Sequence, residues 1–147
     1  MTEEEILSRL TDKNEKTACD FTGEILRESE TSDRYYPLFD AFADLLNAKS
    51  SYVRTRAFAL LCAQSKWDEE GKLSAAFPQM KPLLHDEKPT VVRQALKMLE
   101  SVAEMRPEMR ESIAAETNSI DLSRYKDSMA PLIAKDRAHL LERIAAL

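Results

Sequence analysis

Apolar residues along this chain recur at steps of three and four, which is the spacing of a helix that buries one face. The pattern is clearest from Thr90 to about Met105, where Val91, Ala95 and Leu99 follow one another at steps of four. No segment alternates apolar and polar residues over the length of a strand. The sequence therefore predicts an all-α chain of eight or nine helices joined by short polar turns.

The same spacing predicts the bounds of the helices. They are Glu3–Leu10, Asn14 to about Glu28, Tyr36–Asn47, Tyr52 to about Lys66, a segment from Asp68 to about His85, Thr90 to about Met105, Glu108 to about Ala115, Leu122 to about Ala134, and Asp136–Ala146. Pro78 and Pro82 lie inside the segment that ends near His85. We expect that segment to start late, near Phe77, or to bend, because proline lacks the N–H that a helix interior needs. Pro131 is expected near the end of the helix that begins at Leu122.

The apolar pattern also repeats at a fixed offset of 38 residues. Val53 recurs as Val91 and Ala57 as Ala95. The other repeated pairs are Leu45-Leu46 with Leu83-Leu84, Leu61 with Leu99, and Phe39 with Phe77. A fixed period in this range is typical of stacked helical hairpins, each too thin to bury its own apolar face.

Composition supports one globular domain over residues 1–147. Hydrophobic residues make up 44% of the chain and charged residues 32%, which is typical of a folded rather than a disordered chain. Gly23 and Gly71 are the only glycines. A sheet with tight hairpins, or a loop that cradles phosphate, usually needs more, so both are disfavoured.

The charge of the chain disfavours a nucleic-acid partner. Its net charge is −5 and its pI is near 5.2, whereas binding to phosphates needs a basic face. No apolar run is long enough to cross a bilayer, and the first residues, MTEEEILSRL, are acidic, unlike a signal peptide. We therefore expect a cytoplasmic protein with no membrane contact.

Candidate chemistry is sparse. Cys19 and Cys62 form no C-x-x-C pair and are expected to be reduced core thiols, with a disulfide or redox pair as the alternative. His85 and His139 lack zinc-site spacing and are expected to be surface or rim residues. No nucleophile motif or phosphate-binding loop is present. We expect no catalytic residue, metal or cofactor, and hence no enzyme.

Two segments resemble the second helix of HEAT repeats. One is Val53-Arg54-x-x-Ala57-x-x-x-Leu61, and the other is Leu84-x-Asp86 followed by Val91-x-x-x-Ala95-x-x-x-Leu99. A weaker copy starts at Leu10-x-Asp12, and the C-terminal Pro131-Leu132-Ile133 echoes Pro82-Leu83-Leu84. The resemblance implies an armadillo-type, right-handed α–α superhelix of about four HEAT-like hairpins, with degenerate end repeats. As a whole, the chain is similar to a small bacterial family of single-domain HEAT-like proteins without a firmly assigned activity.

The chain departs from the HEAT pattern in its charged pair. The pattern has an Asp in the turn and an Arg early in the second helix, and the two form a ladder between neighbouring repeats. Here Arg54 lacks its own Asp, because Ala48 stands there, and Asp86 lacks its own Arg, because Val92 stands there. Our hypothesis is that Arg54 and Asp86 pair with each other.

The second helices of a HEAT stack line its inner face, which is the usual binding surface. Off the core stripe, the chain has Arg54, Arg56 and Phe58 in one repeat and Arg93, Gln94 and Lys97 in the next. These residues predict a local basic groove for an acidic peptide; the alternative is a solvated helix face. Trp67 is expected either to pack over a repeat junction or to anchor a partner.

The leading hypothesis is a non-enzymatic module that binds a protein or an acidic peptide. The alternative is a nucleic-acid-binding protein of the helical-repeat DNA glycosylase kind, which the resemblance suggests through its V-R-x-x-A helices. A third possibility is a subunit or regulator whose outer face docks onto a larger assembly.

Overall fold

The computed structural model describes all residues from 1 to 147, is 78% helical and contains no strand, which confirms the all-α class. The α-helices are α1 (Glu3–Leu10), α2 (Glu15–Ser29), α3 (Phe39–Asp44), α4 (Ser51–Ala63), α5 (Lys72–Met80), α6 (Pro89–Met105), α7 (Arg110–Asn118) and α8 (Ala130–Ala146). The 3-10 helices are η1 (Tyr36–Leu38), η2 (Leu45–Asn47), η3 (Ser65–Trp67), η4 (Lys81–His85), η5 (Pro107–Met109) and η6 (Leu122–Arg124).

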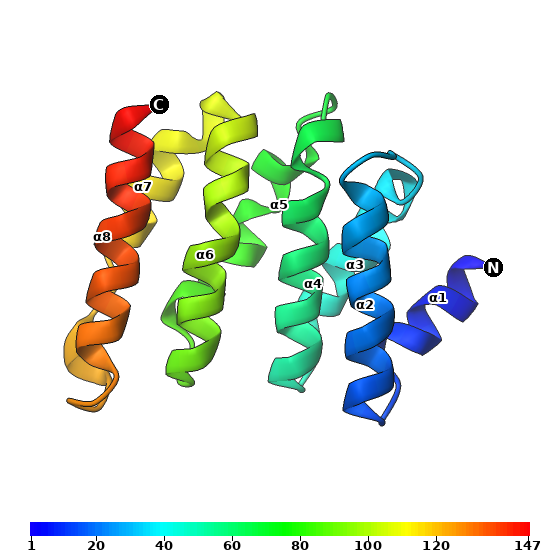
Figure 1. The fold of residues 1–147 in the computed structure, drawn as a ribbon, viewed down its shortest axis with the longest axis horizontal. Coiled ribbons are helices and arrows are strands. Elements are labelled where there is room, and N and C mark those ends of the chain that lie inside the picture. Colours follow the sequence, from blue (N-terminus) through cyan, green and yellow to red (C-terminus); the bar gives the residue numbers. More distant parts are fainter. The chain divides into compact units, whose positions relative to one another are not determined.

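The helices form two compact units, Met1–Leu73 and Ser74–Leu147. In the first unit, α2 lies beside α4 and runs in the same direction, while α1 packs on α2 and α3 packs on α4 (Figure 1). In the second unit, α6 lies beside α8, again in the same direction, and α7 packs against both. The assignment of residues 1–147 to a single domain stays a prediction.

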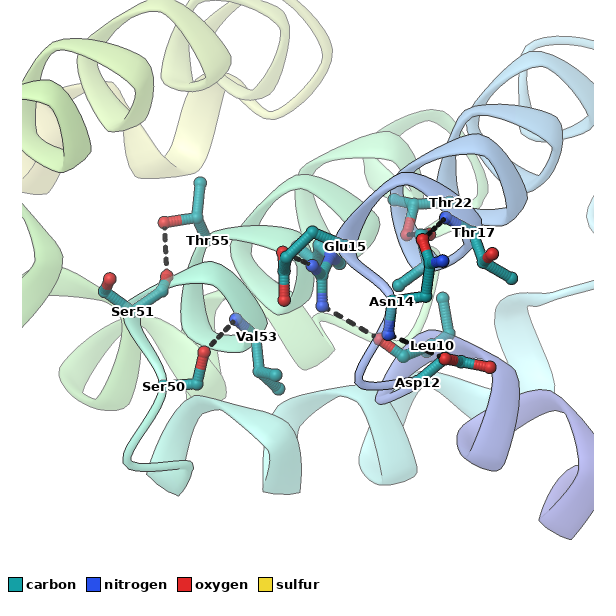
Figure 2. A network of polar contacts seen from close by, with 12 residues as sticks. Leu10, Asp12, Asn14, Glu15, Thr17, Thr22, Ser50, Ser51, Val53 and Thr55 are labelled. Atoms are coloured by element: carbon teal, nitrogen blue, oxygen red, sulfur yellow. Dashed lines mark hydrogen bonds and ion pairs between the residues drawn. The ribbon is translucent and has the colours of Figure 1, made fainter.

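Polar side chains fix where several helices begin. The Thr2 hydroxyl accepts the Glu5 N–H at the start of α1, and the Asn14 carboxamide accepts the Thr17 N–H at 3.0 Å at the start of α2. Ser50 caps α4 in the same way through the N–H of Val53 (Figure 2). These side chains satisfy donors that a helix start leaves unpaired. The cap residues are local signals, and the predicted starts of the first two helices agree with the structure to within one residue.

Three predicted helices differ from the structure in how they are divided. Residues 36–47 do not form one helix, because the tighter η1 and η2 flank a short α3. Conversely, the two helices predicted from Leu122 onward are wrong: residues 122–124 form only η6, and a single helix, α8, covers residues 130–146. Pro131 lies in the first turn of α8, where proline needs no hydrogen-bond donor, rather than near the end of a helix.

Of the two alternatives for the segment that ends at His85, the late start near Phe77 is wrong, because α5 begins at Lys72. Pro78 lies inside α5, and the chain changes to the 3-10 helix η4 at Lys81. The carboxylate of Asp68 accepts the backbone N–H groups of Lys72 and Leu73 at 2.8 and 2.9 Å. It also accepts the hydroxyl of Tyr36 at 2.6 Å. Burial and then this hydrogen bond raise the pKa of Tyr36. Asp68, which is 1% exposed, therefore starts α5 and holds η1 against that start.

The repeated positions are buried alike in most cases. The starts of α4 and α6, at Ser51 and Pro89, are separated by the offset of 38 residues. Ala57 is 0% and Ala95 is 1% exposed, while Leu61 and Leu99 are both fully buried. Val53 and Leu45 are the exceptions, since each is half-buried whereas its counterpart, Val91 or Leu83, is buried. The offset seen in the sequence thus marks equivalent core positions on α4 and α6.

Candidate functional site

Arg54 lies in the first turn of α4, and its guanidinium is directed to the turn before that helix. It donates hydrogen bonds to the carbonyls of Ala48 at 3.0 Å and Lys49 at 2.7 Å. These carbonyls follow η2, so the Arg54 charge stabilises the end of that segment. Asp86 in turn accepts the N–H of Lys88 at 2.9 Å before α6. The pairing of Arg54 with Asp86 stays a prediction.

Arg56 is buried on α4 and binds the turn between α1 and α2. Its Nη1 donates to the carbonyl of Leu10 at 3.1 Å, and its Nη2 forms an ion pair with Glu15, the first residue of α2 (Figure 2). Arg56 is only 8% exposed. The prediction that Arg56 lies on an open face is therefore wrong, because α2 and the turn before it cover that side of α4.

Phe58 is also buried rather than exposed on an open face. Its side chain is 0% exposed, so the prediction that it projects from the core stripe of α4 is wrong. α4 packs against α2, α3 and η2, and its buried residues extend well beyond one stripe. A helix with neighbours on several sides buries positions that its own periodicity assigns to solvent.

Trp67 is half-buried at the end of η3 and is tied to the end of α2. Its indole Nε1–H donates to the carbonyl of Ser29 at 2.8 Å, and the carboxamide of Gln64 donates to the Ser29 hydroxyl at 3.1 Å. The Lys66 ammonium lies 5.7 Å from the centroid of the Trp67 ring and donates to the carbonyl of Glu30. The hydrogen bonds from Trp67 and Lys66 satisfy carbonyls that the C-terminus of α2 leaves unpaired.

Arg93, Gln94 and Lys97 lie together on α6. Gln94 and Lys97 are exposed, whereas Arg93 is half-buried, and its Nε lies 2.6 Å from Asp136 Oδ2 on α8. The hydrogen bond to Asp136 raises the pKa of Arg93. On α6, the predicted groove residues Gln94 and Lys97 are therefore accessible, whereas Arg93 is paired with Asp136. Arg54, Arg56, Phe58 and Trp67 belong to the other unit, so a groove continuous across all seven residues stays a prediction.

The C-terminal unit also contains a cluster of polar side chains that the sequence pattern did not predict. A groove of about 360 Å³ there is lined by Phe77 and Met109 at buried positions and by Lys81 and Glu116. His85 Nε2 lies 2.6 Å from one oxygen of Glu116, and Lys81 Nζ lies 3.9 Å from the other. Glu116 is 31 residues from His85, so no local spacing could have indicated the pair. In this cluster, the carboxylate of Glu116 lies close to two basic side chains, those of His85 and Lys81.

The cysteines differ from each other. Cys62 is buried on α4, and burial raises the pKa of its thiol, whereas Cys19 is exposed on α2. Both are free, so the prediction of two core thiols is wrong for Cys19. A thiol with a raised pKa is a poor nucleophile, because the thiolate is the reactive form.

No three His, Cys, Asp or Glu side chains come together in a way that could hold a metal ion. None of the helices combines the length and apolar character that crossing a membrane requires. No protein-family model matches the chain, and comparison with the curated proteins and with the solved structures gives no match either. Function is therefore inferred from the chain's own residues.

Proposed function

We propose that this chain is a non-enzymatic binding module built from about four HEAT-like hairpins in an armadillo-type, right-handed α–α superhelix, with degenerate end repeats. The matching burial of Ala57 with Ala95 and of Leu61 with Leu99 supports repeated packing at a constant period. Stacked hairpins present long helix surfaces, which such proteins use to bind partners. A crystal structure in which successive hairpins are not related by a constant right-handed rotation would contradict the repeat assignment.

The partner we propose is a protein or peptide with an acidic segment, bound on the open face of α6. The observation that carries this proposal is the position of Lys97 and Gln94, which are exposed on a helix whose opposite stripe is fully packed. The ammonium of Lys97 offers a charge for a carboxylate, and the carboxamide of Gln94 offers both a donor and an acceptor to a peptide backbone. The adjacent Arg93 lies at the edge of this face, where it pairs with Asp136.

The test uses a fluorescein-labelled, glutamate-rich peptide as the probe and fluorescence anisotropy as the measurement. Lys97→Glu is expected to weaken binding by about fivefold or more at low salt, because it replaces an attraction with a repulsion. Lys13→Glu is the matched control, since Lys13 is also exposed and the change in net charge is the same. Equal losses in both variants, or no binding by the wild-type protein, would contradict the proposed site.

A nucleic-acid partner is the alternative, and the same assay with a short DNA duplex distinguishes it. The net charge of −5 opposes this partner, and the N-terminal unit carries all of that excess while charges balance in the C-terminal unit. Binding to duplex DNA is favoured most at low salt, because it releases counterions. Binding there that Lys97→Glu abolishes would favour the nucleic-acid partner over the acidic peptide.

A further inference from the structure

The last helix, α8, is held differently from the other long helices. It has 17 residues, but only Ile133 and Leu140 are fully buried. α6 has the same length and buries seven residues, and the shorter α2 buries five. Apolar burial is the main favourable term in helix packing, so α8 gains less of it per residue than its neighbour α6.

Charged pairs make up the other part of the contact between α6 and α8. Near the starts of the two helices, Arg93 pairs with Asp136 at 2.6 Å. Towards their ends, Arg143 lies 2.9 Å from Glu100 and also pairs with Glu104. His139 adds a contact of 3.4 Å to Glu100. These side chains retain between 12% and 63% of their exposure, so added salt can screen them.

The order of the charges favours the observed register of α8 on α6. α6 carries a cation at Arg93 followed by anions at Glu100 and Glu104, while α8 carries an anion at Asp136 followed by a cation at Arg143. The two helices run in the same direction (Figure 1). Each sign therefore faces its opposite. Sliding α8 towards the far end of α6 would bring Asp136 towards Glu100 and Glu104. The charge pattern therefore opposes that displacement as well as favouring the observed contact.

We propose that α8 is a salt-sensitive clasp: a terminal helix that ion pairs hold in register on α6 and that opens as a unit while the rest of the chain stays folded. Elements with few buried apolar side chains are the first to open in a native protein. Opening of α8 also releases the Arg93 guanidinium from Asp136. The clasp does not depend on the proposed binding function, because it follows from the contacts of α8 alone.

The test is amide hydrogen exchange of the full chain, read by mass spectrometry at about 0.05 M and about 1 M NaCl, a range over which charge screening changes severalfold. Exchange in α8 is expected to accelerate by about tenfold at the higher salt, given several partly exposed pairs. Exchange in α2 is the internal control, and it should change little. Equal acceleration in α2 and α8, or none in α8, would overturn the clasp.

Variants at the first pair give an independent test under the same conditions. Arg93→Asp and Asp136→Arg should each accelerate exchange in α8, because each places like charges side by side. The double variant, which swaps the two charges, should return exchange in α8 close to the wild-type rate. Lys16→Asp is the matched control, since Lys16 forms an exposed pair within α2 at 2.8 Å. A double variant that exchanges as fast as the single variants would contradict a register set by charge.

Discussion

Arg56 and Gln94 occupy equivalent positions of α4 and α6, separated by the 38-residue offset, but their surroundings differ. Arg56 is buried and binds Leu10 and Glu15, whereas Gln94 is exposed. At the scale of a residue, the repeat therefore places Arg56 and Gln94 at the same position of their helices. The neighbouring elements decide whether each side chain is buried. The pair offers a matched test of what the buried contacts contribute.

Arg56→Ala is expected to lower the free energy of unfolding by about 1–3 kcal/mol, because it leaves a buried carbonyl without its donor. The lower part of that range allows for Glu15, which is half exposed and regains water. Gln94→Ala should change the free energy by no more than about 0.5 kcal/mol, as is usual for an exposed residue. Urea unfolding followed by circular dichroism measures both values. Similar effects in the two variants would mean that the Arg56 contacts contribute nothing.

Tyr36 stabilises the folded protein, and this stabilisation is lost at alkaline pH. Its folded-state pKa is raised, first by burial and then by the hydrogen bond to Asp68. The stabilisation is fully present below the ordinary tyrosine pKa of about 10 and is lost as the pH rises through the folded pKa, because unfolding then lets the phenol ionise.

Tyr36→Phe removes both effects. At neutral pH it should cost about 1–2 kcal/mol, since Asp68 loses a donor. Above pH of about 10, the difference between variant and wild type should shrink, because the variant has no phenol to ionise at this position. Urea unfolding at neutral and at alkaline pH measures the difference. A difference that stays constant with pH would contradict the raised pKa.

The two thiols provide a readout of local opening. Cys19 is exposed, while Cys62 is buried with a raised pKa. Ellman's reagent should therefore label Cys19 rapidly and Cys62 only as the N-terminal unit opens. A Cys19→Ser variant isolates the slow thiol. Rapid labelling of Cys62 in that variant would show that α4 is less tightly packed than its contacts indicate.

At the scale of the elements, the two glycines have opposite roles. Gly71 has a φ of +74° in the turn before α5, and a Cβ added there would meet no atom within 4 Å. Gly23 lies inside α2, where an added Cβ would come 3.4 Å from the flexible Arg27 side chain. The backbone therefore favours glycine at Gly71, whereas Gly23 has no positive φ that would favour glycine.

Gly71→Ala should cost about 1–2 kcal/mol, because a left-handed backbone brings a Cβ too close to the following carbonyl oxygen. Gly23→Ala should stabilise the protein by about 0.5–1 kcal/mol, because alanine loses less conformational freedom in a helix than glycine does. Thermal and urea unfolding of the two variants measure whether each substitution stabilises or destabilises the protein. A gain at Gly71 or a loss at Gly23 would mean that the turn or the helix differs from the structure described.

At the scale of the whole molecule, the constant offset predicts that a repeat can be added. We expect that duplicating residues 51–88 and inserting the copy before Pro89 yields a folded, more helical protein, since each hairpin in a stack contacts its neighbours alone. Inserting the same residues in scrambled order is the control. Circular dichroism and urea unfolding compare the two chains. An unfolded or aggregated duplication would contradict the repeat assignment.

The sequence by itself determined the class and much of the local structure. The three-and-four spacing of apolar residues predicted α6 to within one residue at its start, and polar caps such as Asn14 marked the first helices. The 38-residue offset correctly paired Ala57 with Ala95. These features are local or periodic, so they can be recognised in a single sequence. Pro131 was misread because proline fits a helix start as well as the region of a helix end.

The tertiary structure alone decided which side chains remain accessible. The sequence pattern placed Phe58 and Arg56 off the core stripe of α4, but both are buried, and Arg56 binds the turn before α2. The cluster of His85 with Glu116 and the pairs that hold α8 join residues 31 to 43 positions apart. The physical reason is that a helix's own periodicity identifies one packed stripe, whereas burial of its other positions depends on how many neighbours surround it.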